Sequence, residues 1–268
     1  MSTKTLFFVL GGLIFGTGLY FLPDRTPPQI TLYDDLIEAE IEVMPANEQA
    51  MFDALNNRVG KGNKEAQRKT YAELASFWQA RNQSAIQAEF LRKAAGLGVD
   101  APEEWGKSGD LFFESIHSTE DESEQMDYVF HAMYCYEKLL EANPDDLNRK
   151  LNLSECYTEH QGNIMQGVLL LREVATADPS NAEAQMRLGR FSLMSGQNDK
   201  AIARFKSALA GDSLNLQARV LLAESLASSG DLNGAIQNLK EGLALFSDTL
   251  VINELQNIVS QLETASGR

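Results

Sequence analysis

Two pairs of side chains in the sequence combine residue types that bind metal ions or form disulfides. His131 and Cys135 are four residues apart, as are Cys156 and His160, so on two helices each pair would share one face. If these helices run antiparallel, the four donors meet, which suits a zinc site. In an oxidising compartment, the two thiols suit a disulfide between Cys135 and Cys156. We favour a third interpretation, in which both cysteines are small packing residues, because free cysteines usually behave in this way.

No other stretch of the sequence carries a catalytic pattern. The chain has 268 residues and only three histidines. It lacks a glycine-rich phosphate loop, a nucleophile elbow and an HExxH pair. We therefore predict a protein that is not an enzyme and needs no cofactor. The formal net charge of −15 also argues against nucleic acid as a partner, since a phosphate backbone would be repelled.

Most of the negative charge is concentrated in one segment. Residues 101–147 hold 2 basic and 13 acidic side chains, so 2 − 13 gives a net charge of −11. Within this segment lies an acidic stretch that lacks the spacing and the glycine of a calcium-binding EF-hand loop. We predict an enlarged acidic loop, for which a solubilising surface is the default explanation and docking of a basic protein partner the sharper prediction. The carboxylates of this docking loop are Glu120, Asp121, Glu122 and Glu124.

The N-terminal residues have the composition of a membrane anchor. The run from Leu6 to Leu22 has 17 residues without a charge, which reach roughly 25 Å as a helix, near the lower limit for a membrane span. No small-residue cleavage pattern follows it, so we predict an uncleaved transmembrane signal anchor over residues 1–22, with a cleaved signal peptide as the alternative. Lys4 and the N-terminal amino group favour a cytoplasmic N-terminus. The layout of one N-terminal anchor followed by a folded domain leads us to expect a bacterial inner membrane, with the C-terminal domain in the periplasm. Residues 23–46 hold four of the seven prolines and are predicted to form an extended spacer.

Internal repetition is the strongest pattern in the rest of the chain. Each repeated unit contains two apolar-periodic segments joined by a glycine-containing turn, which predicts two helices per unit. Two sets of residues recur at a spacing of 34: Gly162, Gly196 and Gly230, and Val168, Ile202 and Ile236.

The best-formed unit resembles the tetratricopeptide repeat family. Leu188 and Gly189 match the leucine–glycine pair of the family's first helix. Ala201, Phe205 and Ala208 match the small–large–small set of its second helix. The resemblance implies an all-α, TPR-like helix-turn-helix solenoid of about five helix pairs, which follows the single N-terminal transmembrane helix.

The repeats divide the chain beyond the spacer into three parts. Residues 47–147 are predicted to form degenerate TPR-like helices that include the acidic loop, with a single opening helix over residues 47–59. Residues 148–247 form the well-formed repeats. Residues 248–268 form a capping helix, which we expect over residues 253–263, and a tail.

The family resemblance also implies a binding groove, because the first helices of successive tetratricopeptide repeats line a surface where ligands usually lie. Members that clamp a C-terminal carboxylate place Lys and Asn at two positions of this surface. Neither position keeps those residue types in this chain, so a clamp is not expected. The implied partner groove consists of Leu151, Glu155, Glu159, Met186, Arg190, Met194, Val220 and Glu224.

Together these patterns predict a membrane-anchored scaffold that mediates protein–protein interactions at the extracytoplasmic face of the membrane. It would assist the translocation or assembly of exported proteins. One alternative within the binding class is an accessory protein of cytochrome c maturation that binds the unfolded apocytochrome. An alternative from another class is a metal- or thiol-dependent protein built on His131, Cys135, Cys156 and His160.

Overall fold

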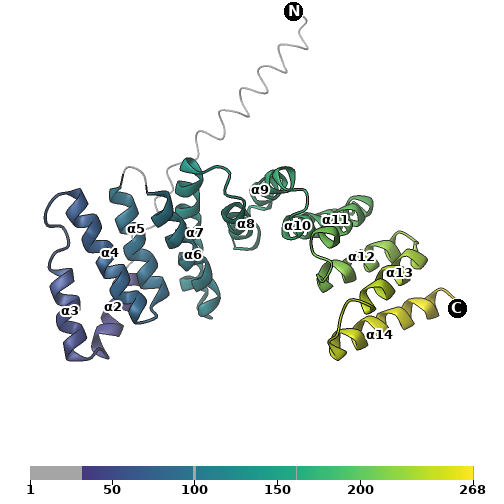
Figure 1. The fold of residues 1–268 in the computed structure, drawn as a ribbon, viewed down its shortest axis with the longest axis horizontal. Helices are drawn as coiled ribbons and strands as arrows, with labels where there is room; N and C mark the ends of the chain where they lie inside the picture. Colours follow the sequence, from purple (N-terminus) through teal and green to yellow (C-terminus); the bar gives the residue numbers. More distant parts are fainter. Residues whose placement is uncertain (1–31, 99–100, 161, 268) are drawn as a thin grey trace, which may run out of the picture. The chain divides into compact units, whose positions relative to one another are not determined.

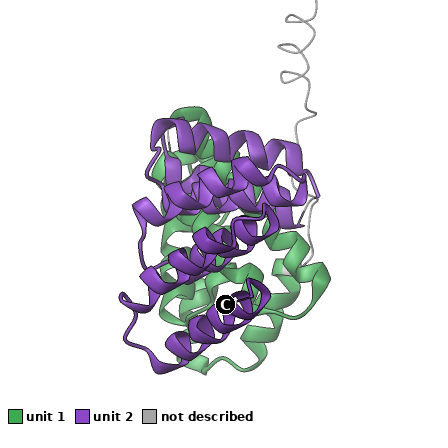
Figure 2. Cartoon of the chain, turned by 90° about the vertical axis from the view of Figure 1, so that its right-hand side faces the viewer, with its two compact units in different colours: residues 1–142 green, residues 143–268 purple. Residues whose placement is uncertain are grey.

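The computed structural model describes residues 32–98, 101–160 and 162–267. In this part of the chain there are 13 α-helices and no strand, so the all-α prediction is confirmed for it. No helix among these residues has the length and apolarity needed to cross a bilayer. The predicted anchor over residues 1–22 and the first part of the predicted spacer lie outside the described residues. The chain divides into two compact units, residues 1–142 and residues 143–268, which are coloured separately in Figure 2.

Unit 1 consists of two helix pairs preceded by two further helices. The helix α4 pairs with α5, and α6 pairs with α7, while α2 packs against α5 and α3 against α4. The bounds are α2 Leu32–Glu42, α3 Ala46–Asn56, α4 Lys64–Ala80, α5 Ser84–Leu97, α6 Pro102–Ser115, the short 3₁₀ helix η1 Ile116–Ser118, and α7 Glu122–Ala142 (Figure 1).

The core of unit 1 is rich in aromatic rings. Trp78 on α4 is fully buried, and its ring meets that of Phe52 on α3 edge-on at 5.5 Å between centroids. Asn63 begins α4 by accepting a hydrogen bond from the backbone N–H of Ala66. Asn82, with φ of 58°, makes the left-handed turn between α4 and α5 where the later repeats use glycine. The degenerate repeats therefore keep the helix-turn-helix geometry with different residues.

Unit 2 contains the three well-formed pairs and a closing helix. The pairs are α8 with α9, α10 with α11, and α12 with α13, and α14 packs against α13. With α4–α5 and α6–α7, this makes five pairs among the described residues, as predicted. The bounds are α8 Leu147–Glu155, the π-helical turn η2 Cys156–His160, α9 Ile164–Ala177, α10 Ala182–Met194, α11 Asn198–Gly211, α12 Leu216–Ser228, α13 Leu232–Leu243 and α14 Thr249–Ala265 (Figure 1).

Each repeat of unit 2 begins and turns in the same way. The side chains of Asn181 and Asn215 accept hydrogen bonds from the N–H groups three residues on, at 3.0 Å and 2.9 Å, and so cap α10 and α12. Gly196 and Gly230 follow these two helices with φ of 71° and 90°, a left-handed backbone that glycine adopts without steric cost. The 34-residue period is therefore a period of helix starts and stops.

The small residues of the repeat let its two helices lie close together. A β-carbon on Gly189 of α10 would lie 2.5 Å from Cε1 of Phe205 on α11. The Phe205 ring is fully buried, as are Ala201 and Ala208 on the same helix. Close packing at these positions fixes the arrangement of the pair, because protein interiors leave little free volume.

Three boundaries differ from the sequence predictions. The prediction of an extended spacer is wrong for its second half, because residues 32–42 form the helix α2, and Tyr33 on this helix is buried. The prediction of an enlarged acidic loop is also wrong, because η1 and α7 include most of these residues and leave only residues 119–121 between the two helices. The closing helix α14 is longer than predicted, and its apolar residues Leu255 and Val259 join the core formed with α12 and α13.

Candidate protein-binding surfaces

The predicted groove residues fall into three groups by exposure. Glu159, Arg190, Met194 and Glu224 are exposed, while Leu151, Glu155 and Val220 are half-buried. Met186 is 7% exposed and packs with Ala208 and Ala218, so it belongs to the core and not to a binding surface. The inclusion of Met186 was wrong because the family pattern fixes its helix position but not how deeply its neighbours cover it.

An ion-pair network removes one further charge from the predicted groove. Arg187 on α10 bonds to Glu155 on α8 and to Glu183 one turn earlier on its own helix. Burial opposes ionisation of Arg187, but the two carboxylates outweigh it and raise the pKa of its guanidinium above its usual range. Glu155 therefore holds α8 and α10 together, which leaves Arg190, Glu159 and Glu224 as the exposed charges of the predicted groove.

His131 lies in an aromatic setting, not in a metal site. Its ring stacks on Phe112 at 5.0 Å and meets Tyr33 edge-on at 5.3 Å, and in the described part of the chain neither ring nitrogen has a hydrogen-bond partner. Burial lowers the pKa of His131 to about 4. No group of three or more His, Cys, Asp or Glu among the described residues could hold a metal ion. The zinc alternative is therefore wrong for these residues.

Both cysteines are buried free thiols, each within its own unit. The thiol of Cys135 donates to Ser108 Oγ at 3.4 Å, and Ser108 in turn donates to the carbonyl of Ala88 at 2.8 Å. Burial raises the pKa of Cys135 to about 12 and that of Cys156 above its usual range, which keeps both thiols protonated and unreactive. The structure thus contains no disulfide between them, in agreement with the packing interpretation.

The predicted acidic docking residues cluster at the start of α7. Glu122 and Glu124 lie in its first turn, where negative charge interacts favourably with the helix dipole. Asp121 precedes the helix, and its Oδ1 accepts hydrogen bonds from the N–H groups of Ser123 at 2.8 Å and Glu124 at 3.1 Å. Part of this acidic cluster therefore has a structural role, although its use as a docking site stays a prediction.

The cap suggests a direct comparison of Asp121 with its neighbour Glu120. We expect Asp121→Ala to lower the free energy of unfolding by about 1 kcal/mol, because two backbone N–H groups lose their acceptor. Glu120 is exposed, so Glu120→Ala should change stability by less than about 0.5 kcal/mol. Urea unfolding followed by circular dichroism gives the free energy of unfolding of both variants and so distinguishes the two effects. Equal effects of the two substitutions would show that Asp121 is not a cap in solution.

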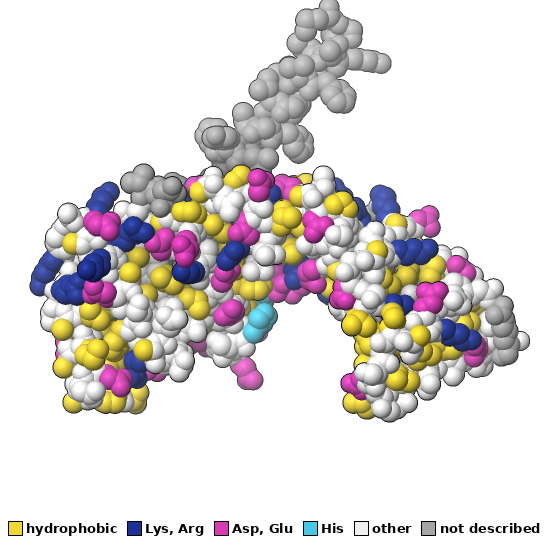
Figure 3. Space-filling model, viewed as in Figure 1, with side chains coloured by type: hydrophobic (Ala, Val, Ile, Leu, Met, Phe, Trp, Pro, Cys, Tyr) yellow, Lys and Arg dark blue, Asp and Glu magenta, His cyan; other side chains and the backbone are white. Residues whose placement is uncertain are grey.

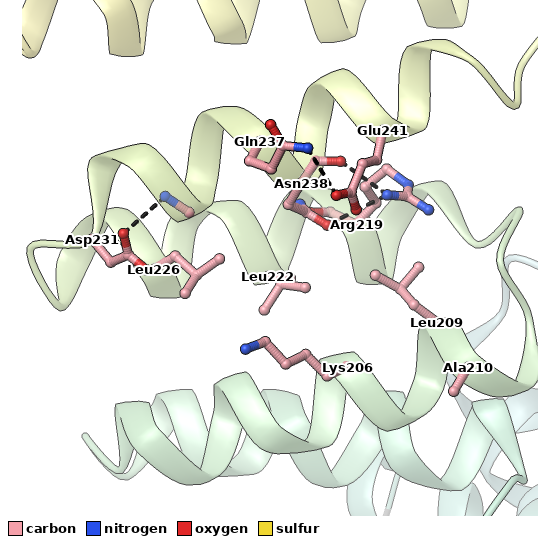
Figure 4. A pocket seen from close by; sticks show the side chains of 11 residues that line it. Lys206, Leu209, Ala210, Arg219, Leu222, Leu226, Asp231, Gln237, Asn238 and Glu241 are labelled. Carbon is pink, nitrogen blue, oxygen red and sulfur yellow. Dashed lines mark hydrogen bonds between the residues drawn. The ribbon is translucent and has the colours of Figure 1, made fainter.

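Two grooves in unit 2 were not found from the sequence. One, of about 440 Å³, lies between α11, α12 and α13 (Figure 4). Its polar groups are mostly used internally: Arg219 Nη1 donates to the carbonyl of Asn238 at 2.9 Å, Asn238 Nδ2 donates back to the carbonyl of Arg219 at 2.8 Å, and Gln237 donates to Glu241. The second groove lies one repeat earlier, between α9, α10 and α11. A comparison of lining positions 34 residues apart could have located both from the sequence.

The helix pairs, their turns and the exposed faces of their first helices define a helical-repeat protein suited to protein–protein interaction. Residues 192–256 match the family model of the tetratricopeptide repeat. This match covers the last residues of α10, all of α11 to α13 and the first half of α14, where the repeat pattern of the sequence is also regular. Members of the family are typically scaffolds without catalytic activity. No curated protein matches the sequence.

Three solved structures share the fold at low sequence identity. YrrB, described as a TPR protein with an unusual peptide-binding site, is 15% identical with a TM-score of 0.52, over 70% of this chain and 91% of YrrB. MamA from Desulfovibrio magneticus RS-1 is 17% identical with a TM-score of 0.52, over 69% of this chain and 96% of that one. Another MamA structure is 14% identical with a TM-score of 0.52, over 62% and 90%. At these identities the likeness shows the fold alone.

Proposed function

We propose that this chain is a membrane-anchored scaffold that binds protein partners on the extracytoplasmic side of a bacterial inner membrane, where it assists the translocation or assembly of exported proteins. The exposed face of the first helices in unit 2 is the observation that carries partner binding. Arg190 on α10 and Glu224 on α12 are exposed there and make no ion pair within the described residues. The uncharged run between Leu6 and Leu22 supports the anchor.

The make-up of the first-helix surface favours a peptide segment of mixed character. Its free charges are of both signs, and the half-buried side chains of Leu151 on α8 and Val220 on α12 add apolar area. Such a surface selects a ligand by several weak contacts rather than by one strong charge pair. The fold likeness to YrrB, whose description includes a peptide-binding site, supports a peptide as the ligand class.

The acidic start of α7 serves in this proposal as a second contact for a basic region of the partner. The structure sharpens its test, because Asp121 must be left in place to keep the helix cap. Neutralising Glu120, Glu122 and Glu124 to glutamine should slow association and reduce its dependence on salt. Partner binding with an unchanged association rate and salt dependence would remove this contact from the proposal.

Site-specific photo-crosslinking in cells tests the proposed function. A photoreactive phenylalanine derivative would replace Arg190 or Glu224 in the full chain, and Gln261 on the exposed face of α14 would serve as the control position. We expect discrete protein adducts from positions 190 and 224, recovered in the membrane fraction, and none from position 261. Protease added to spheroplasts should degrade these adducts, since the repeats would face outward.

Each component of the proposal has its own contrary outcome. Adducts that form equally at all three positions would show that the first-helix face is not the binding surface. Adducts confined to the soluble fraction would contradict the anchor. Membrane-bound adducts that survive protease in spheroplasts but not in lysed cells would place the repeats in the cytoplasm.

A further inference from the structure

A second surface of unit 2 combines exposed apolar side chains with basic ones. The groove between α9, α10 and α11, called here the α9–α11 groove, has a volume of about 410 Å³. Its floor is formed by buried Leu188 and half-buried Phe191, and Ile164 stands at its edge. Met165 and Met194 also line it and are 70% and 75% exposed. Two unbranched, polarisable side chains at the rim can adapt to ligands of different shape.

The charges of the α9–α11 groove are all of one sign. Arg172 from α9, and Lys200 and Arg204 from α11, line it, and no carboxylate is among its lining residues. Among the described residues, Arg204 and Lys200 have only neutral hydrogen-bond partners. Arg204 donates to Gln185 at 2.8 Å, and Lys200 donates to Gln197. Arg172 is exposed and has no ion pair in the part of the chain that the structure describes. In a chain with a net charge of −15, an uncompensated basic rim is an exception.

The next repeat provides an internal comparison, because the α11–α13 groove occupies the equivalent place 34 residues on. In Figure 4, Lys206 points from α11 toward Leu222, at the positions equivalent to Arg172 and Leu188. Val168 and Ile202 are both aliphatic, and Ser192 corresponds to Leu226, but five further pairs change from apolar or basic to polar, acidic or glycine on the same helix framework. The pairs, with the α9–α11 residue first, are Met165 and Asp199, Phe191 and Ser225, Met194 and Ser228, Lys200 and Gly234, and Arg204 and Asn238.

This comparison shows that the repeat framework does not require the exposed methionines of the lining or its two cations from α11. The same helix pairing forms with Asp199, Ser225 and Ser228 at the places of Met165, Phe191 and Met194. Met165 and Met194 leave most of their apolar surface in water, so they contribute little to the packing of the pair and lower solubility. Figure 3 shows on unit 2 how hydrophobic side chains (yellow) lie beside Lys and Arg (dark blue). The lining of the α9–α11 groove therefore calls for a ligand.

We propose that the α9–α11 groove docks an acidic peptide segment of a partner protein, which places two apolar side chains against Met165, Met194 and Phe191. Its carboxylates pair with Arg172, Lys200 and Arg204, which face the same groove. The apolar contacts supply affinity, and the basic rim selects acidic segments and speeds their association. This surface takes Met165 and its three cations from the second helices α9 and α11, and it shares Met194 with the predicted first-helix groove, so it differs from the surface of the proposed function in its charges and in most of its residues.

A peptide display experiment on the full chain tests the basic rim of the groove and its exposed methionines together. A library of random 12-residue peptides would be selected on the wild-type protein in mild detergent and counter-selected on the double variant Met165→Asp, Met194→Ser, which carries the residues of the next repeat. We expect the enriched peptides to have a net negative charge and at least two large apolar residues. Their binding should weaken at least tenfold in the double variant and again between 50 and 500 mM salt.

Matched charge reversals locate the contact. Arg172→Glu and Lys200→Glu should each weaken binding of the enriched peptides several-fold, while Lys206→Glu in the α11–α13 groove should leave it unchanged. Carbon-13 labelling of the methionine methyl groups gives a direct readout, since the signals of Met165 and Met194 should move on binding and that of buried Met186 should not.

Four results would overturn the proposal. Enriched peptides that are basic or uncharged would show that the rim does not select acidic ligands. The absence of any peptide family that depends on Met165 and Met194 would show that the groove is not a docking site. Equal loss of binding with Lys206→Glu would indicate a general charge effect. Concentration-dependent self-association of the full chain that the double variant abolishes would assign the groove to a second copy of this chain.

Discussion

Replacing Gly189 with alanine is expected to destabilise unit 2 by about 1–3 kcal/mol, the usual cost of adding volume to a well-packed core. The new β-carbon would lie 2.5 Å from Cε1 of the Phe205 ring, which is fully buried and has no free space to enter. Either α10 and α11 must separate or the ring must leave its preferred rotamer.

A second substitution makes this prediction specific to the contact. Phe205→Leu removes the ring atoms that the new methyl group would meet, at its own cost of a cavity. The double variant Gly189→Ala, Phe205→Leu should therefore be more stable than the sum of the two single effects by about 1 kcal/mol or more. Strict additivity would mean that the two side chains do not meet.

Hydrogen exchange is the appropriate measurement for the Gly189 and Phe205 variants. Both tryptophans of the chain, Trp78 and Trp105, lie in unit 1, so tryptophan fluorescence does not report on α10 and α11. Amide exchange resolved to α10, α11 and α12 follows unit 2 by itself. Loss of protection in α10 and α11, with unchanged protection in α4 and α5, is the expected pattern.

Replacing His131 with phenylalanine is expected to remove much of the acid sensitivity of unit 1. Burial lowers the pKa of His131 to about 4 in the folded chain, whereas an unfolded histidine titrates near 6.5. Between these values the unfolded state binds the proton and the folded state does not. Above pH 6.5 the protonation of His131 therefore takes nothing from the free energy of unfolding. As the pH falls to 4, proton binding to the unfolded state lowers this free energy by about 3 kcal/mol at most.

The charged neighbours of His131 do not reverse this sign. Glu89 on α5 favours the protonated ring, but burial outweighs it, and Arg92 and Lys93 on the same helix oppose protonation. Burial opposes ionisation of Glu89, but its hydrogen bonds to Arg92 outweigh burial and lower the pKa of its carboxyl. The contribution of ionised Glu89 to the stability of unit 1 is therefore lost only in more acidic solution. The difference between wild type and His131→Phe isolates the histidine.

Tryptophan fluorescence follows this second prediction well. Trp105 on α6 meets Tyr134 edge-on at 5.6 Å, and Tyr134 is on α7 together with His131. Urea midpoints measured from pH 7 to pH 4.5 should fall for the wild type and change much less for His131→Phe. His117 is exposed, so His117→Gln serves as the control and should follow the wild type. Parallel curves for wild type and His131→Phe would contradict the buried, neutral state.

The repeats could be predicted from the sequence because their turns and close contacts require particular residue types at fixed positions. Gly196 and Gly230 are needed for left-handed turns, and the Gly189–Phe205 contact requires its two residue types together. Local constraints of this kind repeat with the fold and stand out at a spacing of 34. The helix α2 could not be predicted in the same way, since its proline-rich surroundings dominate the pattern while its burial depends on contacts with distant residues such as Phe112.

The binding surfaces were harder to predict because helix position does not determine exposure. Met186 and Met194 are both on α10, eight residues apart, yet one is 7% and the other 75% exposed. Met186 packs with Ala208 on α11 and Ala218 on α12, whereas Met194 is the last residue of α10. Similarly, the i,i+4 spacing of His131 and Cys135 is compatible with a metal site, but Phe112 and Tyr33 surround the imidazole with rings instead of donors.

The two faces of α14 have a consequence for polymerisation. Its inner residues Leu255 and Val259 are buried in unit 2, while its outer side chains include exposed Glu254, Gln256 and Asn257. A repeat array with an apolar last face could add another copy of itself end to end and grow into a filament. Leu250 in the first turn of α14 is 78% exposed, but the other exposed side chains named here are polar, so this side offers an incoming helix pair little apolar surface to bury and disfavours end-to-end growth.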